Sequence, residues 1–273
     1  MSVRPRLLFH GAAFGIVALF LVLPAAGAGI GSAGVVLAHA APAIFHARGG
    51  STTTQSTNWA GFAISTSNGA VTDVKGSWIV PKVQGKCPSG YQYSSFWVGI
   101  DGYSSNSVEQ IGTDSDCQSG SAVYYAWFEF YPNPSHLISA ITVSPGNIIS
   151  AEVKWASPKF TVTLKDLNTS QSFSKTSKTT HSRSSAEWIA EAPSSGSGIL
   201  PLANFGTVRF GNFSTGLTGT DAAKISGKSG GIGAFSNIQI TMINSAGTAT
   251  KASPSALTPD GTSFNVTWKS AGP

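Results

Sequence analysis

The sequence has few charged residues: only 11% of its 273 residues are Asp, Glu, Lys or Arg. The 17 basic residues are scattered, and no run of four occurs. The formal charge of +5 therefore indicates a solvated surface, and we expect no nucleic-acid partner. The chain is 41% hydrophobic and 10% aromatic, which excludes a disordered protein and favours one large folded domain.

Histidine is also scarce, since only His46, His136 and His181 follow residue 40. A serine triad needs a histidine between its nucleophile and its acid, and no Gly-x-Ser-x-Gly motif is present. The metal-binding pattern His-Glu-x-x-His is absent as well. Metal catalysis therefore has little support, and any catalysis must depend on carboxylates, amides and aromatic side chains.

The N-terminus has the pattern of an export signal. Arg4 and Arg6 precede an uncharged apolar run, Gly11 to Leu23, and small residues follow it. Ala38-His39-Ala40 fits a small-x-small cleavage site, and Ala26-Gly27-Ala28 is an earlier candidate.

The stretch from Leu7 to Ala38 is also long enough for a retained membrane anchor. Pro24 and the glycines and alanines after it favour cleavage instead. We assign 1–40 to a signal peptide, 41–56 to a short pro-segment or flexible lead, and 57–273 to one domain. The product is expected to be secreted, monomeric and without stable membrane association.

The sequence has only two cysteines, Cys87 and Cys117. In an exported protein two such residues are expected to form a disulfide. Closing a loop of this length stabilises the fold by roughly 3–4 kcal/mol in the chain-entropy account. Neither a zinc site nor a catalytic thiol is indicated, because no neighbouring histidine pattern accompanies them.

Helical periodicity is missing from the chain after residue 57, apart from one possible turn near Pro201–Asn204. Short alternating runs separated by turn residues predict strands instead. The predicted strands are Asn58–Ser65, Thr72–Val80, Ser94–Asp101, Ser107–Gly112, Ala122–Tyr131, Ile138–Val143, Ile148–Trp155, Lys159–Leu164, Glu187–Glu191, Thr207–Phe210, Asn237–Asn244 and Ser263–Trp268. A dozen strands without helical crossovers predict an all-β antiparallel sandwich.

The strand Ala122–Tyr131 predicts which side chains share a face. Alternation places one apolar set toward a core: Tyr124, Ala126, Phe128 and Phe130. The other set suits either a ligand-binding face or a cover for loops: Tyr125, Trp127, Glu129 and Tyr131.

Seven short motifs occur in order along most of the chain after residue 57. They are Asn58-Trp59-Ala60-Gly61, Gly76-Ser77-Trp78-Ile79-Val80-Pro81, Trp97-Val98-Gly99-Ile100-Asp101-Gly102, Glu109-Gln110-Ile111-Gly112, Tyr125-Ala126-Trp127-Phe128-Glu129-Phe130-Tyr131-Pro132, Ala186-Glu187-Trp188-Ile189-Ala190-Glu191 and Phe205-Gly206. In this order and spacing the chain resembles the glutamic peptidases, or eqolisins. The resemblance implies two bent, roughly seven-stranded antiparallel sheets of concanavalin-like type, and an acid-active endopeptidase that acts on polypeptides without a cofactor.

The resemblance also implies roles for individual residues. The catalytic pair corresponds to Gln110 and to Glu191, the second acid of its motif rather than Glu187. The expected substrate-binding residues are Trp97, Asp101, Tyr125, Trp127 and Glu129, with a structural hydrogen-bonding role for Asp101. Familiar fungal members have an acid where this chain has Tyr125, and their disulfide pattern differs from the one available here.

The proposed pair is chemically sufficient for peptide hydrolysis. An ionised carboxylate can take a proton from water and return it to the leaving nitrogen, while an amide orients the water and donates N–H to the oxyanion. Two other interpretations stay open from the sequence. One is a β-sandwich glycoside hydrolase that uses Glu129 and Glu191; the other is a non-catalytic carbohydrate-binding sandwich.

Overall fold

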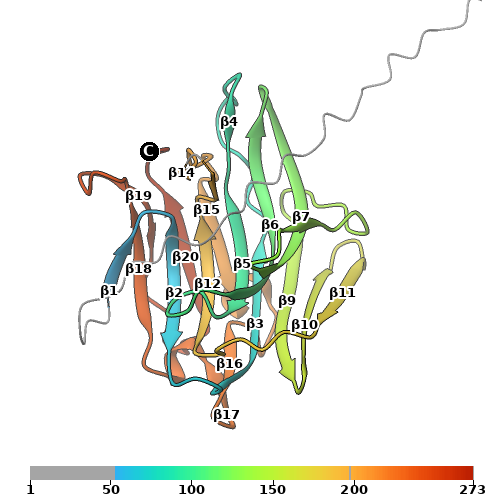
Figure 1. Ribbon diagram of the computed structural model, residues 1–273. Helices are drawn as coiled ribbons and strands as arrows, with labels where there is room; N and C mark the ends of the chain where they lie inside the picture. Colours follow the sequence, from blue (N-terminus) through green and yellow to red (C-terminus); the bar gives the residue numbers. More distant parts are fainter. Residues whose placement is uncertain (1–52, 197, 273) are drawn as a thin grey trace, which may run out of the picture. The chain divides into compact units, whose positions relative to one another are not determined.

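The computed structural model describes residues 53–196 and 198–272. The part of the chain it describes consists mainly of β-strands arranged in two layers (Figure 1). The first sheet has the order β1 (Thr53–Ser56), β18 (Ile238–Ile243), β2 (Trp59–Ser65), β12 (Ser185–Glu191), β5 (Ser95–Ile100), β6 (Val108–Gln118) and β7 (Ser121–Tyr131). The short strands β4 (Tyr91–Gln92) and β8 (His136–Leu137) extend it.

The second sheet has the order β19 (Thr250–Pro254), β20 (Ser263–Trp268), β15 (Thr207–Gly211), β3 (Val71–Ile79), β9 (Ile148–Ala156), β10 (Lys159–Asp166) and β11 (Ser172–Ser177). β16 (Ala222–Ile225) also pairs with β3 and carries β17 (Lys228–Gly231). The β18–β19 hairpin joins the two sheets. This arrangement confirms the predicted all-β sandwich with two roughly seven-stranded layers.

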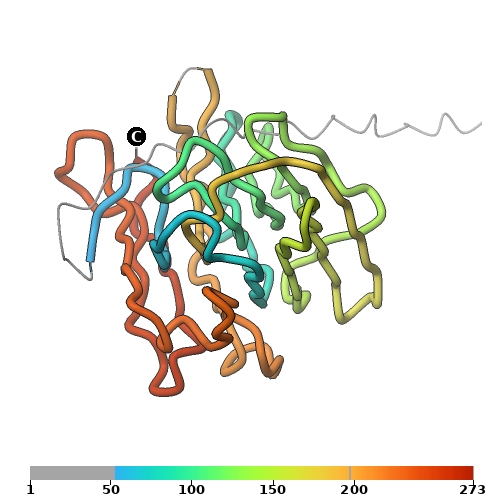
Figure 2. The backbone as a smooth tube through the Cα atoms, turned by 60° about the horizontal axis from the view of Figure 1, so that its bottom comes forward, coloured from blue at the N-terminus to red at the C-terminus, as the bar shows by residue number. Residues whose placement is uncertain are grey.

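Among the strands of the described residues, the pairing of β1 with β18 is parallel. β1 runs parallel to β18, with Thr53 opposite Gln239, and lies along it in both views (Figures 1 and 2). The signal-peptide prediction, and the first part of the predicted lead up to residue 52, lie outside the described residues. The remainder of that lead, Thr53–Ser56, belongs to the folded sheet, which the sequence analysis did not anticipate.

The apolar core lies between the two sheets and follows the predicted alternation. On β7, Ala126, Phe128 and Phe130 belong to the core and Tyr124 packs against it, as predicted. Trp78 of β3 is fully buried there, and its Nε1 donates to Thr113 Oγ1 at 2.9 Å. Each large apolar side chain buried in this way contributes about 1.5–3 kcal/mol.

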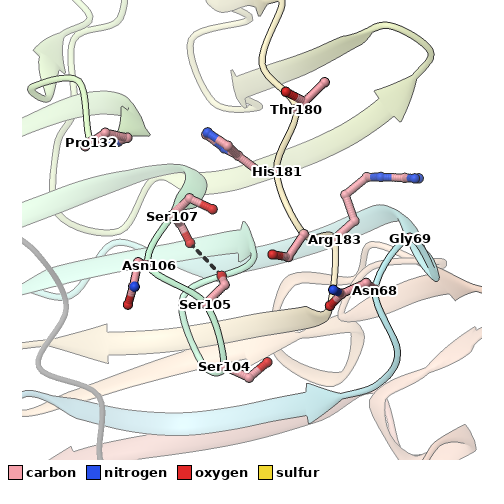
Figure 3. A pocket seen from close by; sticks show the side chains of 11 residues that line it. Asn68, Gly69, Ser104, Ser105, Asn106, Ser107, Pro132, Thr180, His181 and Arg183 are labelled. Atoms are coloured by element: carbon pink, nitrogen blue, oxygen red, sulfur yellow. Dashed lines mark hydrogen bonds between the residues drawn. The ribbon is translucent and has the colours of Figure 1, made fainter.

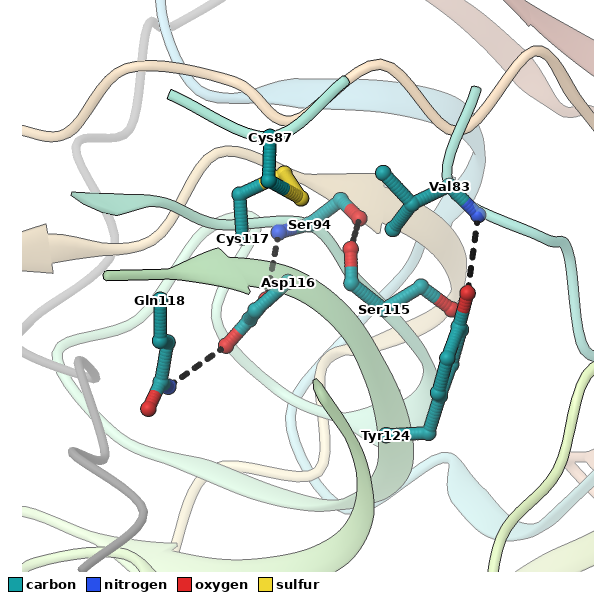
Figure 4. The surroundings of a disulfide bond; sticks show 8 residues. All are labelled: Val83, Cys87, Ser94, Ser115, Asp116, Cys117, Gln118 and Tyr124. Atoms are coloured by element: carbon teal, nitrogen blue, oxygen red, sulfur yellow. Dashed lines mark hydrogen bonds between the residues drawn. A yellow bond between two sulfur atoms is a disulfide. The ribbon is translucent and has the colours of Figure 1, made fainter. Parts of the chain in front are cut away.

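The predicted disulfide between Cys87 and Cys117 is present (Figure 4). It joins the connection before β4 to the end of β6 and packs with Val83. Beside it, Tyr124 Oη accepts a hydrogen bond from the Val83 backbone at 3.1 Å. The disulfide thus holds the chain before β4 against the end of β6.

Some predicted elements are wrong. Residues 138–143 do not form a strand; a turn with Ile141 N donating to Ile138 O carries their apolar side chains into the core. Pro201–Asn204 is not helical, and the helical turns of the described residues are α1 (Asn212–Thr215) and η1 (Ile232–Ala234). A further small hairpin joins β13 (Ser194–Ser195) to β14 (Gly198–Ile199).

Candidate active site

The face of the first sheet that points away from the core, here called the outer face, carries the predicted site residues. Residues directly opposite one another in neighbouring strands share a face. Glu191 lies opposite Ser95 of β5, and Gln110 lies opposite Gly99 of the same strand. Ser95 and Gly99 alternate with the core residues Phe96 and Val98, so Glu191 and Gln110 both point to the outer face.

The register also determines the distance between the Cα atoms of Gln110 and Glu191. They are two strands apart and four residues apart along the sheet. On a flat sheet this offset separates their Cα atoms by about 16 Å. Both side chains are long, and the strands β5 to β7 twist and bend strongly (Figure 1). Joint action on one substrate atom requires this curvature to bring the side chains toward each other.

Glu191 is buried at the end of β12 and accepts hydrogen bonds from uncharged donors. Trp97 Nε1 donates to Glu191 Oε2 at 2.7 Å, and Asn58 Nδ2 donates to Glu191 Oε1 at 3.2 Å. Hydrogen bonds of this kind favour the ionised form of a carboxyl group, which burial alone disfavours. The donors therefore suit a carboxylate that has to accept a proton.

The position of the Trp97 indole depends on two neighbouring residues, Trp59 and Gly112. Trp59, which lies opposite Glu191 on β2, packs edge-on against it with ring centroids 5.1 Å apart. On β6 its neighbour is Gly112, whose missing side chain leaves room for the Trp97 backbone and Cβ. Trp97 and Trp127 are both buried on the outer face, outside the main core cluster.

Gln110 is held by Glu129, its direct neighbour on β7. Gln110 Nε2 donates to Glu129 Oε2 at 2.6 Å. The second N–H of the amide remains for another acceptor. Gln110 Oε1 is buried and has no hydrogen-bond partner within the described chain. The amide thus offers a donor and an acceptor to a bound molecule.

A second polar cluster lies next to Glu191 on the outer face. Trp127 Nε1 donates to Asp114, and the Tyr125 hydroxyl lies 2.9 Å from Asp114 Oδ2 and 2.7 Å from Asp116 Oδ2. Burial, together with the charge of Asp114, raises the pKa of Asp116 well above its ordinary value. Asp116 can then donate its proton to the phenol oxygen while Tyr125 donates to Asp114.

The sequence analysis missed Asp114 because it ended the strand at Gly112. The predicted strands leave residues 113–121 unassigned, whereas β6 continues to Gln118. Counting by twos from Gln110 along an uninterrupted strand would have placed Asp114 on the same face.

Asp101 is engaged in holding a loop. It is fully buried, and its carboxylate accepts hydrogen bonds from the backbone N–H groups of Arg183 and Ser184 at 2.6 and 2.8 Å. These bonds tie the end of β5 to the segment that leads into β12. The structure therefore places Asp101 as an anchor for the strand that carries Glu191.

Glu187 lies in the same row of the outer face as Gln110, on the other side of Gly99. It is fully buried, and burial raises its pKa well above the ordinary value. A carboxyl group with a raised pKa stays protonated in acid and cannot serve there as a base. Burial therefore makes Glu187 poorly suited to that role.

An open pocket of about 950 Å³ lies beside these elements (Figure 3). Residues 104–107 and 180–183 face one another across it, and none of the seven predicted site residues lines it. His181, on its wall, is half-buried and is hydrogen-bonded through Nδ1 to the buried Glu109, a pair that the sequence analysis did not identify. The lining of the pocket consists mainly of short polar side chains, and neither Gln110 nor Glu191 is part of it.

Residues 53–196 and 198–272 contain neither a metal-binding cluster nor a membrane-spanning helix. No cluster there has three or more His, Cys, Asp or Glu side chains placed to bind a metal ion. The same residues include no helix long and apolar enough to cross a bilayer.

Comparisons with known proteins identify the family of the chain. The chain is 35% identical to aspergillopepsin-2 of Aspergillus niger over 180 residues, which are 58% of this chain and 63% of that protein. It is 39% identical to scytalidopepsin B of Scytalidium lignicola over 101 residues, which are 35% of this chain and 38% of that protein. The matches thus span less than two thirds of either relative.

Solved structures give a longer match. A crystal structure of scytalido-glutamic peptidase with a transition state analog inhibitor superposes with a TM-score of 0.63 at 26% identity, over 78% of this chain and 98% of that one. The crystal structure of aspergilloglutamic peptidase from Aspergillus niger superposes with a TM-score of 0.56 at 29% identity, over 65% of this chain and 99% of that one. Residues 57–262 match the Peptidase A4 family. The chain belongs to that family, the glutamic peptidases or eqolisins.

Proposed function

We propose that this protein is a secreted endopeptidase that hydrolyses polypeptides in acid through Gln110 and Glu191. The observation that carries the proposal is the pairing of a buried carboxylate with uncharged donors and a neutral amide on one sheet face. A carboxylate beside an amide keeps its charge in acid more readily than one of two adjacent carboxylates. The family membership supports the same reaction.

In the proposed reaction the ionised Glu191 takes a proton from a water molecule. The water oxygen bonds to the peptide carbon, and the carbonyl oxygen becomes an oxyanion. This oxyanion accepts a hydrogen bond from the second N–H of the Gln110 amide. Glu191 then returns the proton to the leaving nitrogen as the C–N bond breaks. Glu129 fixes the Gln110 amide throughout, because it occupies the other N–H. Side chains and water supply every step.

The substrate is proposed to be an unfolded polypeptide bound along the outer face, with Trp97, Trp127 and Tyr125 beneath it. Export follows from the N-terminal pattern, and the disulfide fits an oxidising compartment. We expect a monomer that contacts neither nucleic acid nor, after signal cleavage, a membrane.

The test is digestion of an acid-denatured protein by the full chain after acid incubation. Glu191→Gln and Gln110→Ala are each expected to lower kcat by at least about 100-fold, the usual cost of one essential donor or base. EDTA should leave the rate unchanged. Near-parental turnover by Glu191→Gln would show that Glu191 is not the base.

The same variants separate the two alternatives. A glycoside hydrolase would require Glu129 and Glu191 and tolerate Gln110→Ala, whereas a carbohydrate-binding sandwich would give no turnover. Glu129 lies one strand farther from Glu191 than Gln110 does, and its carboxylate is bonded to Gln110. We therefore expect Glu129→Gln to lower peptidase activity only in part.

A further inference from the structure

We propose that Asn58 is a positioning residue for Glu191: its side-chain amide, oriented by Ser56, holds the carboxylate for proton transfer. This inference rests on the proposed function, since it assigns a role in the same reaction. It makes the short segment before β2 part of the active site.

Asn58 is fully buried and is bound to the Glu191 region through both its side chain and its backbone. Its Nδ2 donates to Glu191 Oε1 at 3.2 Å. Its carbonyl oxygen accepts from the Ala192 N–H at 2.8 Å, next to Glu191 in the chain. Trp59, the following residue, lies opposite Glu191 in the ladder. Asn58 therefore cannot shift without moving the end of β12.

Ser56 determines which way the Asn58 amide faces. The Ser56 hydroxyl oxygen accepts from the backbone N–H groups of Asn58 at 3.3 Å and Trp59 at 3.1 Å. With its lone pairs engaged, the hydroxyl has its proton free to donate to Asn58 Oδ1, at 2.9 Å. The amide oxygen is thereby occupied, and the NH₂ group must face Glu191.

The chemistry requires such a neutral donor. A cation paired with Glu191 would lower its affinity for the water proton, whereas a neutral N–H favours the charged form and leaves the carboxylate basic. Within the described chain, ionisable groups near the cluster include Asp114 on β6, and Lys251 on β19, whose Nζ donates to the Thr57 carbonyl at 3.4 Å.

The experiment measures pH profiles of kcat and KM for the full chain after acid incubation, with Asn58→Ala, Asn58→Asp and Ser56→Ala. Asn58→Ala is expected to lower kcat about 10- to 100-fold, below the loss typical of a donor that contacts the oxyanion itself, with KM nearly unchanged. The pH below which kcat of this variant falls should move to a higher value, because Glu191 loses a hydrogen-bond donor that favours its ionised form. Asn58→Asp should move this pH further, and Ser56→Ala less.

Asn147→Ala is the matched control. Asn147 is also buried and also donates to a carboxylate, Asp166 Oδ1 at 3.4 Å, but it lies outside the site. It should lower the melting temperature without moving the pH profile. A purely structural role for Asn58 predicts the same behaviour for both variants, and that result would overturn the proposal.

Two further results separate this inference from the proposed function. If Glu191→Gln is inactive while the Asn58 and Ser56 variants keep the parental kcat and pH profile, only this inference is wrong. If Glu191→Gln stays active, both are wrong. Should Asn58→Ala fail to fold by circular dichroism, Ser56→Ala decides, since an unchanged profile for it contradicts the orienting role.

Discussion

Gly112 shows how a single residue shapes the site. It lies on β6 between Trp97 and Trp127 of the neighbouring strands. A Cβ at this position would come within 2.4 Å of the Phe96 carbonyl oxygen and 2.7 Å of the Trp97 Cβ. Such contacts force the backbone of β5 to move, and Trp97 would move with it. The glycine therefore preserves the Trp97 bond to Glu191.

We predict that Gly112→Ala lowers the stability by about 1–3 kcal/mol, the usual cost of overpacking, and also reduces kcat. Thermal unfolding and peptidase assays measure the two effects. Gly90→Ala is the control, because a Cβ there meets nothing within 4 Å, and it should behave like the parent. A Gly112→Ala variant with parental stability and activity would show that the close approach is not needed.

At the scale of residues, the sequence was informative where a motif specified a side chain and its face. The outward set on β7 was predicted by alternation, and the structure joins Tyr125, Trp127 and Glu129 to acceptors or donors on β6. The orientation of the Asn58 amide could not be predicted, because it depends on Ser56 and on Glu191, which lies 133 positions away in sequence. Such a contact follows from strand order, which local patterns do not contain.

At the scale of elements, strands with strong apolar alternation were predicted well, and polar edge strands were not. β9 and β10 have buried residues at every second position over most of their length, and β3 does so from Val74 to Trp78. All three strands were predicted to within two residues of their ends. β11 is mostly exposed Ser, Thr and Lys, and β1 consists of Thr, Gln and Ser, so neither has an apolar face to detect. Their strand geometry comes from backbone pairing with β10 and β18.

The pairing of β1 leads to a prediction about processing. The sequence placed 41–56 in a lead, but Thr53–Ser56 pairs with β18 and supplies Ser56 to the site. A chain that begins at Thr57 should melt roughly 2–10 °C below one that begins at Thr53, because it loses ladder bonds and leaves Asn58 Oδ1 buried without its donor. Equal melting temperatures and equal activity for the two chains would place β1 outside the functional domain.

At the scale of the whole molecule, buried acids adapt the fold to low pH. Burial raises the pKa of Glu109 to about 7, and burial with the charge of Glu152 raises that of Asp73 to about 6. Burial also raises the pKa of Asp116, Glu187 and Asp221 well above their ordinary values. For these groups the folded state binds more protons than the unfolded state between about pH 4 and 7, so their contribution to stability falls as pH rises through that range.

We predict that the melting temperature increases when the pH is lowered from 7 to 4, as measured by circular dichroism. Glu187→Gln removes one raised pKa with little change of shape. Its stability should match that of the parent at pH 4 and exceed it at pH 7. At pH 7 folding of the parent requires Glu187 either to bind a proton from neutral solution or to be buried with its charge, and both lower the free energy of unfolding. An equal loss of stability at both pH values would contradict this electrostatic account.

The central claim is that Gln110 and Glu191, which start two strands and four residues apart, act on one substrate carbonyl. A crystal structure of this chain with a tetrahedral peptide analogue tests it most directly. We predict that one oxygen on the tetrahedral carbon lies about 3 Å from Gln110 Nε2 and that the other lies about 3 Å from the Glu191 carboxylate. A tetrahedral group bound by Glu191 with Gln110 still directed only at Glu129, and out of hydrogen-bonding reach, would contradict the account.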